Sequence, residues 1–397
     1  TEKDPQFALA YAWLSFAARR GTPDAAALAR AKSLLSGATP DEQLLIRWMN
    51  SVQESDLLPA IMTMNDLLKR FPKDKHVLYL TSEWLYFQQD YDRARQLMET
   101  TLQVDPNFAP TLSRLGYIYI ENGNPNPARA IAALQRCVEL QPGQPNPEES
   151  LAEVLRYTGD DRGSLEHYGG VLQLDPTSFT ARVGLADTLT FMGDYSNARD
   201  QYDKAASMAE SSRDQLHAEF QKAFVFFWEG QPEQGRKQLE ALADKARTAK
   251  DPYAQSEIGF ARALLVGNIA GELAQLEALE SFLGKPVTGM SNNDRNVWLA
   301  AIWRERARAY SRASQSDAAG RAVHQLEELA ATSRNLIIEN IYESAHGYAL
   351  FAEGDFANAA DELSTDTHNP LVLQQFILAQ EKLGNSAAAE SARTRLK

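Results

Sequence analysis

Residues 109–142 read APTLSRLGYIYIENGNPNPARAIAALQRCVELQP, and this stretch decides the fold that we expect for the whole chain. Its first apolar set is spaced i, i+3, i+4 and i+7, the spacing of one helix face: Leu112, Leu115, Gly116 and Tyr119. Gly123-Asn124 then forms a turn, because both residue types favour turn conformations. A second apolar set with helical spacing follows: Ala130, Leu134 and Cys137. Pro142 ends the stretch, since proline cannot sit inside a helix. The stretch therefore predicts two helices joined by a turn.

Gly116 lies in the middle of the first expected helix. A glycine there costs about 1 kcal/mol of helix stability relative to alanine, so it needs a structural reason. We expect the second helix to approach the first most closely at this glycine, because it has no side chain to keep the two helices apart.

The same plan returns along the chain. Successive stops at Pro72, Pro106, Pro142 and Pro176 are separated by 34, 36 and 34 residues. A turn precedes each of the later stops, and one more turn follows the last of them: Gln89-Asp90, Gly123-Asn124, Gly159-Asp160 and Gly193-Asp194. Each unit is therefore expected to be a helix pair, with the aspartates capping the second helices. The units keep phase best over residues 41–212.

This pattern resembles the tetratricopeptide repeat (TPR), a helix pair of about 34 residues. The resemblance implies an all-α fold, a right-handed superhelical solenoid of antiparallel helix pairs. It also implies a concave surface lined mainly by the first helix of each pair. More loosely, the chain is similar to TPR arrays of larger bacterial proteins. Some of those follow kinase or DNA-binding modules, and others stand alone in the cell envelope.

We expect about eleven helix pairs in three stretches. Residues 1–283 form a TPR array, residues 284–294 an irregular loop, and residues 295–397 a degenerate helical-repeat array with a C-terminal cap. The opening Thr1–Pro5 resembles the tail of a helix whose start lies upstream. We therefore expect either a removed signal peptide and leader or a longer parent protein. A location in the bacterial cytoplasm and one in the periplasm or cell envelope both stay open.

Composition and motifs argue against several classes of function. Lys and Arg number 40 against 53 Asp and Glu, and the net charge of −13 disfavours nucleic acid as a partner. No apolar run approaches the roughly 18 residues of a membrane span. The six histidines show no zinc-binding spacing, and no phosphate-binding loop or nucleophile elbow is present. We expect no catalytic residue, no cofactor and no metal, with Cys137 in the core.

The free face of the first helices defines a candidate partner-binding groove. It is rich in aromatic side chains. Over its first four units it carries five carboxylates and one arginine, Arg156. The groove residues are His76, Tyr79, Glu83, Tyr86, Phe87, Ser113, Tyr117, Ile120, Glu121, Glu149, Glu153, Arg156, Tyr157, Asp187, Phe191, Phe220, Phe224 and Trp228. Exposed aromatic side chains commonly mark binding sites. In the alternative interpretation some aromatic rings, Phe224 and Phe227 first, are core, and the carboxylates form a solvated face.

A possible second patch follows from arginines spaced i, i+4 and i+8: Arg304, Arg308 and Arg312. They either bind an acidic segment or pair with acids of the adjoining helix, such as Glu327 and Glu328.

The sequence thus favours a non-enzymatic scaffold that binds an extended protein or peptide segment. The expected partner is basic and carries apolar anchors. The alternative is a regulatory or sensor TPR arm of a larger protein with an upstream kinase or DNA-binding module.

Overall fold

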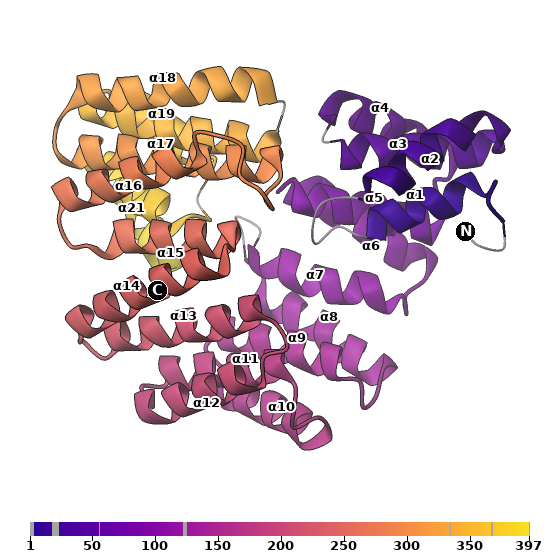
Figure 1. Cartoon of the computed structure of the whole chain (residues 1–397), viewed down its shortest axis with the longest axis horizontal. Coiled ribbons are helices and arrows are strands. Elements are labelled where there is room, and N and C mark those ends of the chain that lie inside the picture. Colours follow the sequence, from indigo (N-terminus) through magenta and orange to yellow (C-terminus); the bar gives the residue numbers. More distant parts are fainter. Residues whose placement is uncertain are drawn as a thin grey trace. The chain divides into compact units, whose positions relative to one another are not determined.

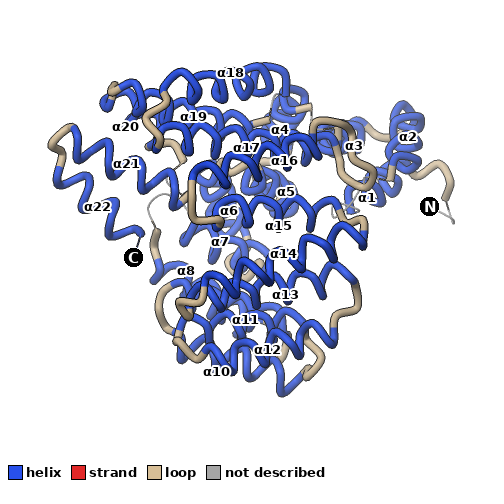
Figure 2. The backbone as a smooth tube through the Cα atoms, turned by 60° about the vertical axis from the view of Figure 1, so that its left-hand side comes forward, coloured by secondary structure: helices blue, strands red, loops and turns tan. Residues whose placement is uncertain are grey.

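The computed structural model describes residues 4–17, 24–54, 56–121, 125–333, 335–366 and 368–396. Within these residues it contains 22 α-helices, one short 3-10 helix at Leu35–Gly37 and no strand (Figures 1 and 2). The chain divides into two compact units. One comprises Thr1–Thr81 together with Phe282–Lys397, and the other is Ser82–Ser281.

Ser82–Ser281 contains the second half of α5 and the helices up to α16. They are α5 (Lys75–Phe87), α6 (Tyr91–Val104), α7 (Ala109–Glu121), α8 (Pro127–Leu140), α9 (Pro145–Tyr157), α10 (Asp161–Leu174), α11 (Phe179–Phe191), α12 (Tyr195–Met208), α13 (Ser212–Trp228), α14 (Pro232–Ala249), α15 (Pro252–Leu265) and α16 (Ile269–Leu283).

The other unit contains the remaining helices and the first half of α5. They are α1 (Ala8–Ala17), α2 (Ala25–Leu34), α3 (Pro40–Gln53), α4 (Leu57–Arg70), α17 (Asn292–Arg312), α18 (Ser316–Ser333), α19 (Leu336–Glu353), α20 (Phe356–Leu363), α21 (Pro370–Lys382) and α22 (Ser386–Leu396). The α-helices of the described residues therefore make eleven consecutive pairs, as the period predicts.

Helix pairs in Ser82–Ser281 stack so that their first helices lie side by side. Helix α7 contacts α9, α9 contacts α11, α11 contacts α13, and α13 contacts α15. Helices α8, α10, α12 and α14 each pack between their own first helix and that of the next pair, and the order can be followed by colour in Figure 1. The first helices therefore form one continuous row, which carries the candidate groove.

Helix α8 lies close against α7 at Gly116, as expected. A Cβ built on this glycine would lie 2.5 Å from the Cγ of Leu134, which is fully buried. The other members of both apolar sets are buried as well, Cys137 among them. The spacing of the apolar residues therefore identified the contact face of this pair correctly.

The turns also follow the predicted chemistry. Gly159 and Gly193 adopt φ values of 82° and 81°, the left-handed region that ends a helix without strain only for glycine. The next residues, Asp160 and Asp194, accept hydrogen bonds from backbone N–H groups in the first turns of α10 and α12. The turn predicted at Gly123-Asn124 lies outside the described residues.

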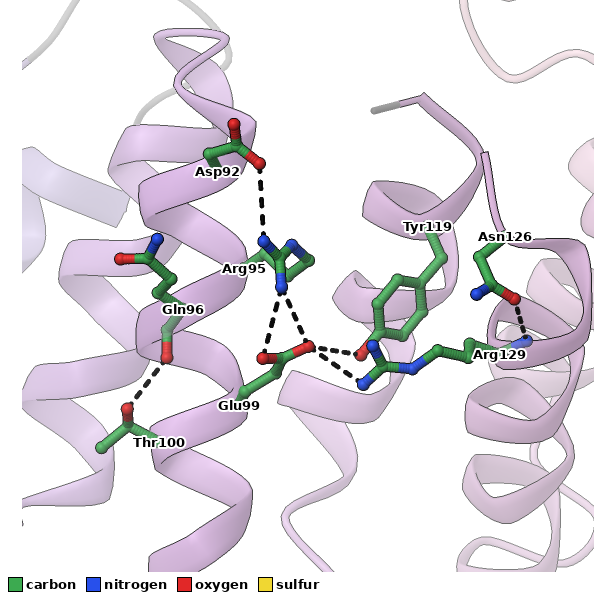
Figure 3. A network of polar contacts seen from close by, with 8 residues as sticks. All are labelled: Asp92, Arg95, Gln96, Glu99, Thr100, Tyr119, Asn126 and Arg129. Atoms are coloured by element: carbon green, nitrogen blue, oxygen red, sulfur yellow. Dashed lines mark hydrogen bonds and ion pairs between the residues drawn. The ribbon is translucent and has the colours of Figure 1, made fainter. Parts of the chain in front are cut away.

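A polar cluster joins neighbouring pairs through α6, α7 and α8 (Figure 3). The Glu99 carboxylate accepts hydrogen bonds from Arg95, from the hydroxyl of Tyr119 at 3.0 Å and from Arg129 at 3.0 Å. The Arg129 guanidinium also lies 4.3 Å from the centre of the Tyr119 ring. Burial, together with the Glu99 carboxylate, raises the pKa of Tyr119 to about 12. These groups are hydrogen-bond or ring-contact partners of one another, so we interpret the cluster as a link between helices rather than as a binding site.

The described helices confirm an all-α array of antiparallel pairs. Helix α16 ends at Leu283 and α17 begins at Asn292, so the connection is shorter than the loop expected over residues 284–294, whose last three residues belong to α17. The division of the array at residues 284–294 stays a prediction. No helix among the described residues is both long and apolar enough to span a membrane.

Candidate functional site

The candidate site is the free face of the first helices in Ser82–Ser281. It draws on the second half of α5 and on α7, α9, α11 and α13. Most predicted groove residues belong to this face, whereas His76 and Tyr79 lie in the half of α5 that belongs to the other unit. Ser113 and Ile120 are half-buried on α7. The candidate site as defined by these helices therefore lies within Ser82–Ser281.

Glu83 on α5 is neutralised by a residue that the sequence analysis missed. The guanidinium of Arg114 on α7 donates a hydrogen bond to the Glu83 carboxylate at 2.9 Å. Arg114 also lies 4.5 Å from the ring centre of Tyr86 and 5.2 Å from that of Phe87. Its spacing of seven residues from Glu121 places it on the groove face, and this spacing was the available signal.

Asp187 on α11 is neutralised in the same way by the preceding first helix. Arg156 on α9 donates to its carboxylate at 2.6 Å, and both side chains are mostly buried. The hydroxyl of Tyr202 on α12 donates to the same carboxylate. Burial, together with the negative charge of Asp187, raises the pKa of Tyr202. The two ion pairs, Glu83–Arg114 and Arg156–Asp187, join successive first helices.

Three other carboxylates of the face have only neutral hydrogen-bond partners. Tyr117 donates to Glu153 at 2.9 Å, Ser178 donates to Glu149 at 2.8 Å, and Glu121 forms a hydrogen bond with Tyr86. Burial raises the pKa of the Glu121 carboxyl. Tyr86 and Arg114 lower it, and the nearby charge of Glu153 raises it further. With Arg114 included, five carboxylates face two arginines, so the face keeps an acidic excess.

Four aromatic side chains occupy the last position of their first helices: Phe87, Tyr157, Phe191 and Trp228. We call them the aromatic row. Their exposed fractions are 49%, 65%, 56% and 57%, high values for rings of this size. In α7 the corresponding position carries Glu121. The row therefore recurs with the repeat and stays open to solvent.

Contacts within the row hold the rings in place. The Phe191 and Trp228 rings meet edge to face with their centres 5.4 Å apart. The guanidinium of Arg156 lies 5.8 Å from the Tyr157 ring centre and 5.9 Å from that of Phe191. Asp187 also accepts a hydrogen bond from Arg156, which lies between these two rings, and side chains already in contact lose less entropy when a partner binds.

Not every predicted aromatic residue is available on the surface. Phe220 is only 6% exposed and belongs to the core between α13, α14 and α15, so its assignment to the groove surface was wrong. Phe224 and Phe227 are partly buried against the same core, as the alternative interpretation expected. Helix α13 carries apolar residues on both of its faces, and the sequence alone did not show which face packs against the core.

The second patch is also wrong for two of its three arginines. Arg304 and Arg308 are each only 9% exposed, so they offer no surface to an acidic segment. Arg304 donates to Glu305 at 3.1 Å and to Asp366 at 3.2 Å, and Arg308 donates to Glu305 at 2.5 Å. The expected partners on the adjoining helix, Glu327 and Glu328, pair with His324 instead. Arg312 is exposed at the end of α17.

Groups with catalytic or metal-binding potential are sparse. Within the described ranges, no cluster of three or more His, Cys, Asp or Glu side chains is placed to hold a metal ion. The thiol of Cys137 is buried, and burial raises its pKa, which disfavours the reactive thiolate. The site offers exposed aromatic surface and carboxylates.

Stacked antiparallel helix pairs with one continuous row of first helices define a helical-repeat protein. The chain matches the tetratricopeptide repeat family over residues 85–136 and over residues 179–212. These two stretches of the chain are tetratricopeptide repeats. No curated protein sequence matches the chain.

Several solved structures are similar in fold at low sequence identity. A tetratricopeptide repeat protein from Parabacteroides merdae is 15% identical, with a TM-score of 0.48, over 56% of this chain and 88% of that one. The type IV pilus biogenesis factor PilW is 17% identical, with a TM-score of 0.44, over 52% and 94%. YrrB, a TPR protein with an unusual peptide-binding site, is 14% identical, with a TM-score of 0.33, over 46% and 91%.

Proposed function

We propose that this protein is a non-enzymatic scaffold that holds an extended segment of a partner protein across the aromatic row. The aromatic row is the observation that carries the proposal, because four large rings at equivalent positions of the repeat are about half exposed or more. Tyrosine and tryptophan side chains are enriched among the residues that dominate binding energy at protein interfaces.

The row suits an extended segment better than a compact surface. Its rings follow successive first helices, whose axes lie about 8–10 Å apart when helices pack directly. An extended chain advances about 3.3 Å per residue, so about every third residue of a bound segment would meet the next first helix. Each well-packed aromatic anchor contributes about 2 kcal/mol.

We propose that the bound segment is basic. The face keeps five carboxylates against two arginines, and Glu121, Glu149 and Glu153 have no cation among their hydrogen-bond partners above. Opposite charges on the two partners favour encounter and correct register more than they deepen affinity. Apolar anchors therefore supply the affinity, and lysine or arginine residues set the specificity.

A display library of random 12-residue peptides, selected on the full chain, tests the proposal. Selected peptides are expected to combine apolar residues with Lys or Arg. The combined variant Tyr157→Ala, Phe191→Ala and Trp228→Ala should weaken their binding at least thirtyfold, the equivalent of one lost anchor of about 2 kcal/mol. Calorimetry or fluorescence anisotropy measures the loss.

Leu174→Ala is the matched control. Leu174 is an equally exposed apolar residue, at 64%, but it ends the second helix of its pair rather than the first. The control variant should bind as the unaltered protein does. Equal binding by the triple variant, or an equal loss on Leu174→Ala, would reject the aromatic row as the binding surface.

The alternative function, a regulatory arm attached to a kinase or DNA-binding module, gains no support from any observation on the described residues and stays an untested prediction.

A further inference from the structure

A pocket lies between the first helices of two neighbouring pairs, beside the first turns of α13 and α15. Its volume is about 250 Å³. Buried apolar residues form its floor: Leu216, Phe220, Ala254 and Ile258. Polar residues complete its lining: Arg213, Asp214, His217, Tyr253 and Glu257. The sequence analysis assigned Phe220 to the groove surface but did not predict the pocket, because the pocket depends on α15.

The only arginine of this lining already has a partner. Arg213 donates two hydrogen bonds to the carboxylate of Asp251, at 3.1 and 3.2 Å, and its guanidinium lies 5.0 Å from the Tyr253 ring centre. Its charge is therefore balanced before any ligand arrives. An anionic ligand would have to break this paired contact, which argues against phosphate or carboxylate ligands.

The carboxylates of the lining have no such balance. Asp214 accepts a hydrogen bond only from the hydroxyl of Ser211 at 2.7 Å and from no cation. Glu257 makes no hydrogen bond within the part of the chain that the structure describes. Burial raises the pKa of its carboxyl, and the nearby charges of His217 and Arg213 lower that pKa only in part. With histidine counted as neutral, Arg213, Asp214, Asp251 and Glu257 sum to a charge of −2. The pocket is therefore complementary to a cation.

The size of the pocket indicates what kind of cation it accepts. Sites for drug-sized molecules usually enclose about 300–1,000 Å³, more than this pocket offers. A lysine or arginine side chain combines an apolar stem with a charged head, and such stems pack readily against apolar surface. The floor fits the stem, and Glu257 with Asp214 fits the head.

We propose that this pocket anchors one lysine or arginine side chain of the partner segment. The inference rests on the proposed function, and it adds a second contact point for the same partner segment. Arg213, His217, Phe224 and Trp228 fall within about 60° of the circumference of α13, so the pocket and the aromatic row share one face of this helix.

Helix geometry sets the spacing between the basic residue and the aromatic anchor. His217 precedes Trp228 by eleven residues, or about 16 Å along the helix axis. A peptide that turns at Trp228, from the aromatic row across the first helices to the direction of the α13 axis, covers that distance in about five extended residues. The recognised segment therefore carries its basic residue about five positions from the apolar residue that contacts Trp228.

A positional series of synthetic peptides tests this spacing. Each labelled peptide has one tryptophan as anchor and either lysine or norleucine placed three to seven residues away. Norleucine keeps the apolar stem and removes the charge. On the full chain, the lysine series should bind most tightly at a separation of about five, and about tenfold more tightly than norleucine there. The norleucine series should show no such preference.

Glu257→Gln should remove this advantage and leave the binding of the norleucine peptides unchanged. Glu240→Gln, an exposed change on the second helix α14, is the matched control, and circular dichroism checks that both variants fold.

Equal affinity for lysine and norleucine on the unaltered protein, or no effect of Glu257→Gln, would overturn the pocket assignment. If the triple variant of the aromatic row still abolished binding in that case, the proposed function would stand without the pocket. Failure of every peptide to bind the unaltered protein would contradict both.

Discussion

At the scale of single residues, Gly116 shows how a local choice fixes a helix pair. Its missing side chain lets α8 place Leu134 against the backbone of α7, with 2.5 Å between the position of an added Cβ and the leucine Cγ. Real Cβ atoms essentially never show that distance, so a side chain at residue 116 must displace the Leu134 side chain or push the two helices apart.

Gly116→Ala is expected to lower the free energy of unfolding by about 1–3 kcal/mol, the usual cost of overpacking a core. Gly169→Ala is the control, because residue 169 is also inside a helix, α10, and an added Cβ there meets nothing within 4 Å. The control should gain up to about 1 kcal/mol from its better helix propensity. Urea unfolding measures both, and an unchanged midpoint for Gly116→Ala would contradict the packing account.

At the scale of elements, ion pairs and hydrogen bonds connect successive first helices, and Glu121 is the carboxylate of this set whose ionised form burial disfavours. Burial raises the pKa of its carboxyl above the usual 4.5. A carboxyl whose pKa is higher in the folded state binds protons more tightly there than in the unfolded state. The folded protein therefore loses stability as the pH rises from 4.5 through the raised value.

Glu121→Gln should remove this loss while keeping an acceptor for the hydroxyl of Tyr86. Its melting temperature should exceed that of the unaltered protein at pH 7, and the difference should disappear near pH 4, where both side chains are neutral. Glu166→Gln, an exposed change on α10, should alter the melting temperature little at either pH. A variant less stable than the unaltered protein at pH 7 would show that the charge of Glu121 is stabilising.

At the scale of the whole molecule, the sequence predicted the helix pairs because each pair is specified by residues within one repeat. Apolar spacing, turn glycines and capping aspartates all act over a few residues, and eleven pairs follow from them. The exposed aromatic row follows the same period, so its four members were predicted as site residues.

Contacts between repeats were the part that the sequence did not reveal. Arg114 and Glu83 are 31 positions apart in the sequence. Arg304 pairs with Asp366, which lies in the loop after α20 and is 62 positions away. Helix α17 also contacts both α18 and α19, which encloses Arg304 and Arg308. A regular arginine spacing on one helix therefore could not distinguish a surface patch from a buried ion-pair network.

The central claim is that a partner segment lies across the aromatic row, and site-specific photocrosslinking tests it most directly. A photoreactive benzoylphenylalanine replaces Phe191 in one protein and Leu174 in another, and each is irradiated with a peptide selected by display. Crosslinking from residue 191 and none above background from residue 174 is the predicted result. Crosslinking from residue 174 alone, or equally from both, would contradict it.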